Sequence, residues 1–153
     1  MENLENLFYL ALDHRDTADL NSLRLGPTTS WLGLYELSTT TELTVLNNFP
    51  DVRNLYLATA NTCAPRGLSS IYTMPGLHGL HLTAMHLPEW LTAREPLPAE
   101  LRTLTLHECV MPGDSRVYRD LSSLNSLSVR SCRTPDGAPI TALDLPVKDL
   151  TIV

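Results

Sequence analysis

Three histidines are the side chains of this sequence that could support acid–base or metal chemistry. His78, His81 and His107 lie within about thirty residues of one another, and histidine is both a frequent metal ligand and the side chain that titrates nearest neutral pH. No cysteine or carboxylate joins them at ligand spacing. Glu108 is nearest in sequence, but alternation along a strand would point it away from His107. We therefore interpret the three histidines as polar surface residues, and a pH-dependent contact with a partner stays a hypothesis.

Cys109 follows His107 by two residues, which is the arrangement of a thiol and a base that could activate it. The strand predicted below places His107 outward and Cys109 in the interior, so the pair cannot cooperate. Cys132 holds the same place one repeat later and would stack beside Cys109 at the strand spacing of about 4.7–4.9 Å. Parallel side-chain directions disfavour a disulfide between them, so both are predicted to be small, reduced core residues.

No motif of a familiar catalytic or cofactor site stands elsewhere in the sequence. It has no glycine-rich phosphate loop, no nucleophile elbow and no HExxH pair. We accordingly predict a protein that is not an enzyme and that needs no cofactor or metal.

The residues above are positioned by a repeated pattern that is clearest in LRTLTLHECVM, residues 101–111. Its frame is L-x-x-L-x-L-x-x-C, and it recurs at intervals of 23 to 25 residues along the whole chain. The central leucine of each copy is Leu7, Leu32, Leu55, Leu80, Leu104, Leu127 or Leu150. A fixed period of this length indicates stacked structural units that share one core.

Each unit is predicted to begin with a short strand, because the last two leucines of the frame alternate with exposed neighbours. The expected strands cover residues 4–9, 29–34, 52–57, 77–82, 101–106, 124–129 and 147–152. Apolar residues three apart predict short helical turns near 38–51, 67–73, 89–93 and 115–122, with Leu43, Leu46, Phe49, Leu68, Ile71, Met74, Val117 and Leu121 facing inward. Prolines argue against a helix in 133–146, where Ile140, Leu143 and Leu145 could form a strand-like piece.

The frame resembles that of the leucine-rich repeat family, and the resemblance covers essentially all of residues 1–153. It implies an α/β solenoid with a curved parallel sheet on its concave side and short helices and irregular segments on its convex side. It also implies one domain, a concave face that binds protein, and a cysteine in the turn after the strand. No capping segment is evident at either end, so we expect a partner or the rest of a longer chain to cover the terminal strands.

Aromatic and basic residues gather at the positions that would face outward from the predicted concave sheet. Exposed aromatic side chains on a rigid surface are typical anchors of protein interfaces. The residues predicted to contact a partner protein are Phe8, Trp31, Tyr35, Tyr56, His81, His107 and Arg130.

Composition narrows the classes of partner. The chain has 153 residues, a net charge of −6, 43% hydrophobic and 18% charged residues, which is typical of one globular domain. An acidic chain disfavours binding to nucleic acid or to a membrane surface. It contains no apolar run long enough for a transmembrane helix and no secretory signal at its start. Three cysteines make no disulfide framework, so we expect an intracellular protein, cytoplasmic or nuclear.

The sequence thus predicts a non-enzymatic protein-interaction module, a scaffold or a subunit of a larger complex. Two more specific alternatives remain open at this point. The cysteine-containing repeats Cys109 and Cys132 resemble those of substrate-recognition domains of ubiquitin ligases, and residues 97–106 resemble repeats of some cell-surface or pathogen effector proteins.

Overall fold

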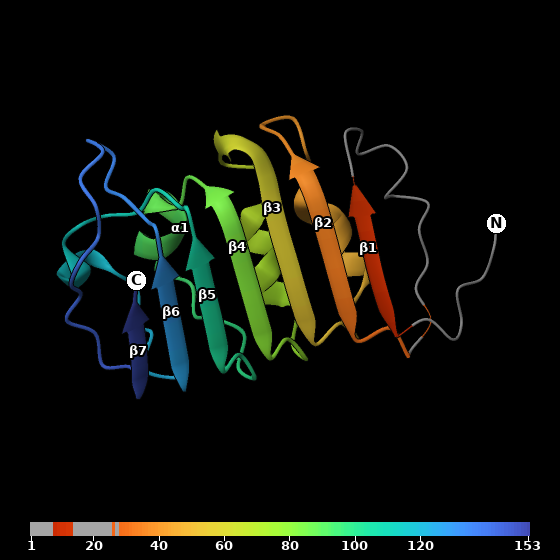
Figure 1. Cartoon of the computed structure of the whole chain (residues 1–153). Helices are drawn as coiled ribbons and strands as arrows, with labels where there is room; N and C mark the ends of the chain where they lie inside the picture. Colours follow the sequence, from red (N-terminus) through yellow and green to blue (C-terminus); the bar gives the residue numbers. More distant parts are fainter. Residues whose placement is uncertain (1–7, 14–25, 27) are drawn as a thin grey trace.

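The computed structural model describes residues 8–13, 26 and 28–153. Their fold is α/β, with a single seven-stranded parallel sheet and a few short helices (Figure 1). The strands stand side by side in sequence order. They are β1 (Tyr9–Asp13), β2 (Trp31–Leu37), β3 (Asn54–Cys63), β4 (Gly79–Met85), β5 (Thr103–His107), β6 (Ser126–Arg130) and β7 (Asp149–Ile152).

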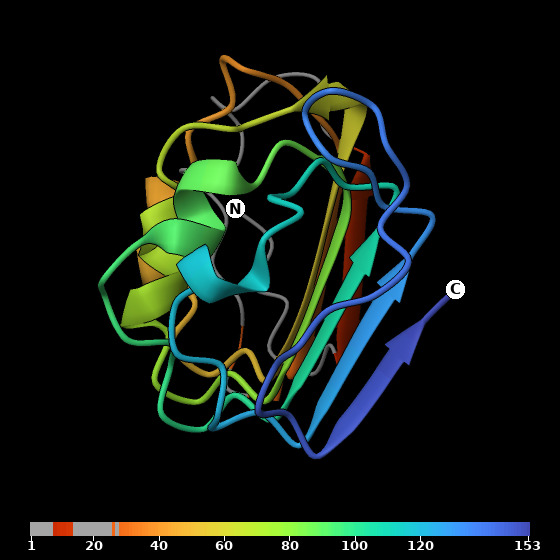
Figure 2. The same ribbon diagram turned by 90° about the vertical axis from the view of Figure 1, so that its left-hand side faces the viewer.

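The helices lie on one side of the sheet, as Figure 2 shows, and no helix of the described residues covers the other side. They are the 3-10 helices η2 (Leu43–Asn48), η3 (Leu68–Thr73) and η4 (Ser115–Val117) and the α-helix α1 (Pro88–Thr92). We call the uncovered side the open face of the sheet. The hydrophobic core lies between the helices and the side of the sheet that faces them.

The register predicted from the leucine frame is confirmed for β2 to β7. The central leucines from Leu32 to Leu150 are direct partners on neighbouring strands. In the inner strands these leucines, and the apolar residues two places later, are at most 1% exposed. Burial of one such side chain stabilises the fold by about 1.5–3 kcal/mol. In β3 to β6 the first apolar residue of the frame (Val52, Leu77, Leu101 or Leu124) precedes its strand and is buried as well. The strands from β2 to β7 each begin two residues later than predicted.

The predicted register of the first strand is wrong by three residues. Leu10 pairs with Leu32 and Leu12 pairs with Leu34, so the central residue is Leu10 and the strand starts at Tyr9. Leu7, Leu10 and Leu12 have the same L-x-x-L-x-L spacing as the other repeats, and this alternative frame supplies three leucines where the frame centred on Leu7 ends in a tyrosine. Positions 4–7 of the expected strand lie outside the described residues.

The predictions for the return segments are confirmed in part. Leu43, Leu46 and Phe49 are buried around η2, and Leu68, Ile71 and Met74 are buried around η3. The segment 133–146 holds no helix, and its two isolated bridges, from Arg133 to Val110 and from Arg133 to Pro139, do not extend to a strand. Leu121 is buried as predicted, but the helix before it is a single turn.

The inward position predicted for Val117 is wrong. Val117 is 48% exposed, whereas Arg119 is 7% exposed and takes the interior place. Its guanidinium carbon lies 4.4 Å from the ring centroid of Tyr72 and 5.4 Å from that of Trp90. A cation that stacks on two aromatic rings replaces the aliphatic contact that the sequence pattern indicated.

A left-handed residue ends four of the strands. Glu36, Ala84, Glu108 and Ser131 each stand four residues after a central leucine and have φ between 51° and 57°. This turn redirects the chain, so that the residue after it is buried. These buried residues, in the order of the turns, are Leu37, Met85, Cys109 and Cys132. Strand β3 lacks this turn and continues to Cys63, which pairs with Met85 after a register shift.

Candidate functional site

The open face displays three rows of side chains, because residues at alternate positions of each strand point to the same side. One row precedes the central leucines, a second follows them, and a third lies two residues beyond the second. In β5, β6 and β7 the first two rows hold hydroxyl side chains and one carboxylate, namely Thr103, Ser126, Asp149, Thr105, Ser128 and Thr151. In β1 to β4 the rows instead bring aromatic rings together.

Five rings form what we call the aromatic cluster: Tyr9, Trp31, Tyr35, Tyr56 and His81. Tyr9 stacks on Trp31 with the ring centroids 4.2 Å apart. Tyr56 lies at the centre, 5.0 Å from Tyr35, 6.0 Å from His81 and 6.3 Å from Trp31. Stacked pairs of this kind each contribute about 0.5–1.5 kcal/mol beyond their buried area. The rings therefore hold one another in place.

Gly33 makes room for the cluster. A Cβ atom on this residue would lie 2.7 Å from Cζ3 of Trp31 and 3.0 Å from Cε2 of Tyr35. The two rings therefore close over the backbone of β2, which a larger residue would prevent. Sequence reasoning missed this role of Gly33, although the order Trp-Leu-Gly-Leu-Tyr places the glycine between two aromatic residues of the same strand face.

Tyr56 and His81 are fixed by further interactions. The hydroxyl of Tyr56 lies 3.0 Å from Oγ1 of Thr83, a hydrogen-bond distance. Partial burial lowers the pKa of His81 from its ordinary value of 6.5. His81 is consequently neutral at pH 7, which suits a ring that stacks among other rings.

Phe8 does not occupy the position predicted for it. It precedes β1, is 70% exposed and belongs to no row of the open face, because the first strand is shifted by three residues. The place in the row beside Trp31 belongs to Tyr9, which is 50% exposed. Trp31, Tyr35, Tyr56 and His81 lie together as predicted.

His107 and Arg130 lie at the ends of β5 and β6, apart from the aromatic cluster, and pair with each other in the sheet register. The prediction that Glu108 points away from His107 is wrong. Oε1 of Glu108 is 3.7 Å from Nε2 of His107, because the left-handed backbone of Glu108 interrupts the alternation of the strand. Arg130 donates a hydrogen bond from Nε to Oγ of Ser128, at 3.1 Å.

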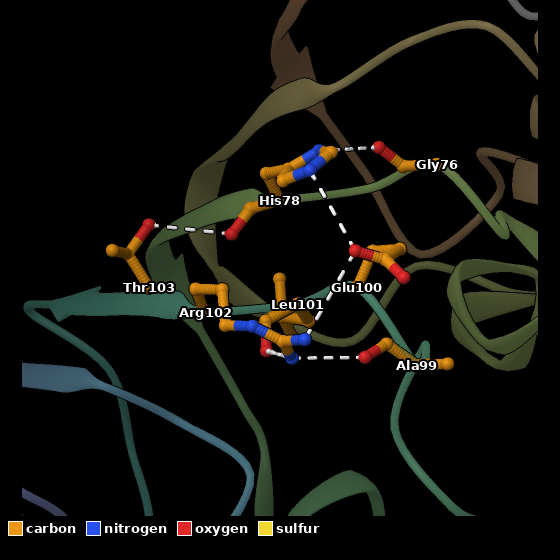
Figure 3. A network of polar contacts seen from close by, with 7 residues as sticks. All are labelled: Gly76, His78, Ala99, Glu100, Leu101, Arg102 and Thr103. Atoms are coloured by element: carbon orange, nitrogen blue, oxygen red, sulfur yellow. Dashed lines mark hydrogen bonds and ion pairs between the residues drawn. The ribbon is translucent and has the colours of Figure 1, made fainter.

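His78 belongs to a different network, at the opposite end of the strands (Figure 3). Its Nδ1 is 2.8 Å from the carbonyl oxygen of Gly76, and its Nε2 is 3.9 Å from the carboxylate of Glu100. Glu100 is also 4.0 Å from Arg102. His78 thus precedes β4 while His107 ends β5. Within the described part of the chain, no three His, Cys, Asp or Glu side chains are grouped as metal ligands.

Two of the three cysteines lie on the inner side of the sheet. Cys109 and Cys132 are buried, unbridged thiols, as predicted. The thiol of Cys109 donates towards the carbonyl oxygen of Leu82, at 3.3 Å. A hydrogen bond with the Cys132 thiol and burial both raise the pKa of Cys109, so it stays protonated and unreactive.

A pocket lies on the helical side, between η3 and α1. It has a volume of about 560 Å³ and is lined by Tyr72, Trp90, Arg66, His86 and Glu89, among others. None of the residues predicted to bind a partner lines it. The sequence offered no signal for this pocket, since its walls come from two separate return segments, those before and after β4.

None of the helices in the described ranges has the length and apolar character that crossing a membrane requires. Comparison of the chain with protein-family models, with curated proteins and with solved structures found no match in any of the three.

Proposed function

We propose that this chain is a leucine-rich repeat solenoid that acts as a non-enzymatic protein-interaction module. A partner protein would bind to the open face of the sheet, and the aromatic cluster would be the main contact. The observation that carries the proposal is the stack of Tyr9, Trp31, Tyr35, Tyr56 and His81 on a face that no helix within the described ranges covers.

The solenoid interpretation rests on repetition along the chain. One frame sets the register of successive strands, and a left-handed residue recurs at the same place after four of them. Such repetition is what stacked, equivalent units produce.

The binding proposal rests on preorganisation. Tyrosine and tryptophan are enriched among residues whose truncation weakens protein complexes most. Rings that already stack against one another lose little conformational entropy when a partner binds. A cluster of this kind on a solvent-facing sheet is costly to leave without a role, because it exposes apolar surface.

The first test uses the whole chain as bait for affinity purification, followed by measurement of the affinity of the purified partner. Replacing both Trp31 and Tyr56 by alanine should weaken binding by about 2 kcal/mol or more. The matched control is the double variant Thr105→Ala and Ser128→Ala, on the same face of β5 and β6, which should bind nearly as the wild type does.

Circular dichroism would first establish that both double variants are folded. Unchanged affinity of the folded Trp31 and Tyr56 variant would show that the open face is not the binding surface.

A further inference from the structure

The helical side of the molecule gathers nitrogen donors that lack an acceptor. Among the described residues, three buried side-chain nitrogens find no hydrogen-bond partner, namely Nε1 of Trp90 and the Nε and Nη1 atoms of Arg119. They belong to one cluster, because the guanidinium carbon of Arg119 lies 5.4 Å from the ring centroid of Trp90. Buried polar groups in native proteins nearly always have a partner, so three such donors in one place indicate a missing acceptor.

Arg119 also lacks a counter-ion. It is 7% exposed, and in the described part of the chain no carboxylate forms an ion pair with it. Its Nη2 donates to the carbonyl oxygen of Glu95. A neutral carbonyl compensates a buried charge less well than an anion does. A negatively charged group is therefore the acceptor that this cluster lacks.

Two adjoining pockets leave room for such a group. The pocket between η3 and α1, of about 560 Å³, has Tyr72 and Trp90 in its wall. A second pocket, of about 410 Å³, is lined by Arg119 itself. Ala93 and Glu95 line both, so the two pockets share a wall. A molecule of one or two rings fits the first pocket, with its charged end directed to Arg119 at the shared wall.

The lining of the first pocket favours a flat body with one negative charge. Tyr72 and Trp90 stack on each other with their ring centroids 6.2 Å apart, and aromatic walls suit an aromatic ligand. Glu89 and Glu95 outnumber Arg66 on the lining, so a dianion such as a phosphate monoester would be repelled. A carboxylate carries a single charge, and its two oxygens can accept hydrogen bonds from all three donors.

We propose that the pocket between η3 and α1 binds a small aromatic carboxylate, with its ring against Trp90 and Tyr72 and its charge on Arg119. The donors are covered in the free chain, so the carboxylate takes the place of the carbonyl of the exposed Glu95. The site lies on the helical side and does not depend on the function proposed for the open face.

The probes are naphthoate and its neutral primary amide, naphthamide, each titrated into the isotope-labelled chain. The nuclear magnetic resonance signal of the Trp90 indole N–H reports on one of the three donors, and Trp90→Phe distinguishes it from the signal of Trp31. Naphthoate should shift the Trp90 signal to saturation, and the amide should bind about tenfold more weakly or worse. The Trp31 signal, on the open face, should not move. Equal affinities, or no Trp90 shift at millimolar naphthoate, would overturn the proposal.

The charge partner is tested with Arg119→Gln. This variant should lose the preference for naphthoate over naphthamide. The matched control is Arg116→Gln, because Arg116 is 88% exposed and lines neither pocket, and it should keep the full preference. A folded Arg119→Gln variant that still prefers the acid would overturn the assignment. If Arg119→Gln does not fold, the comparison of acid and amide on the wild-type chain decides alone.

Discussion

Gly33 shows how one missing side chain shapes the open face. The rings of Trp31 and Tyr35 occupy the space where its Cβ would be. We expect Gly33→Ala to push these rings apart and to lower the free energy of unfolding by about 1–3 kcal/mol, as overpacking does. The same substitution should weaken the near-ultraviolet circular dichroism signal of the stacked rings.

Gly76→Ala is the control, because a Cβ there would only reach ordinary contact, 3.5 Å from the carbonyl oxygen of Pro50. An unchanged near-ultraviolet signal in Gly33→Ala would contradict the packing described for Trp31 and Tyr35.

His81 should make stability depend on pH. Burial lowers its pKa in the folded state from 6.5, so the unfolded chain binds protons more readily in the pH window just below 6.5. The contribution of neutral His81 is fully present above that window and is lost as the pH falls through the folded-state pKa. Denaturant unfolding at pH 7.5 and pH 5.5 would measure the change. His81→Gln should show a smaller loss on acidification than the wild type, and equal losses would refute the assignment.

Among the elements, the left-handed turn at the ends of β2, β4, β5 and β6 was not foreseen from the sequence. A non-glycine residue in the left-handed region costs roughly 1–2 kcal/mol, and Ala84 has φ of 54°. We expect Ala84→Gly to raise the free energy of unfolding, because relief of this strain exceeds the added entropy of the unfolded chain.

Ala58→Gly is the matched change in the extended part of β3. It should lower stability by about 0.5–1 kcal/mol. Destabilisation of similar size in both variants, measured by urea unfolding, would show that the left-handed turn stores no strain.

Arg119 connects the elements of the helical layer. It stacks on Tyr72 of η3 and near Trp90 of α1, and its Nη2 donates to the carbonyl oxygen of Glu95. Among the described residues, the Nε and Nη1 atoms of this side chain find no hydrogen-bond partner. We expect Arg119→Ala to lower the free energy of unfolding by about 2–4 kcal/mol, through lost packing and lost cation–π contact.

Arg116, three residues earlier, offers the control. Its side chain is 88% exposed and pairs with Asp114, and exposed pairs contribute little. Arg116→Ala should therefore unfold as the wild type does. If Arg119→Ala did the same, the buried guanidinium would not be a structural contact.

Some of these features could be predicted from the sequence and others could not, for physical reasons. Leucines that recur at a constant period determine which strand positions pair, so the register from Leu32 to Leu150 could be predicted. The first strand was ambiguous, because Leu7 and Leu10 both fit the frame. Left-handed turns, the extension of β3 to Cys63 and the burial of Arg119 depend on tertiary contacts that no local pattern encodes. Trp31, Tyr35, Tyr56 and His81 were identified, but Tyr9 was not. The closure of the rings over Gly33 was not predicted either.

At the scale of the whole molecule, burial differs between the inner and the outer strands. Leu80 is fully buried in β4, whereas Leu150 of β7 is half-buried. We expect Leu80→Ala to cost about 2–5 kcal/mol and Leu150→Ala about 1 kcal/mol. Denaturant unfolding of the two variants tests this, and equal costs would imply that β7 is covered in solution as well as β4 is.

On the open face, equivalent side chains of neighbouring strands recur at a fixed spacing. Neighbouring strands place equivalent side chains about 4.7–4.9 Å apart, so every second strand repeats at roughly 9.6 Å. A polyproline II segment returns the same side to a surface every three residues, or about 9.3 Å. Lying across the strands, such a segment would keep step with β2 and β4, whereas a β-strand, with its same-side repeat near 6.6 Å, would drift out of step within one interval. The spacing of the strands thus favours a partner segment in the polyproline II conformation over a β-strand, whatever side chains that segment carries.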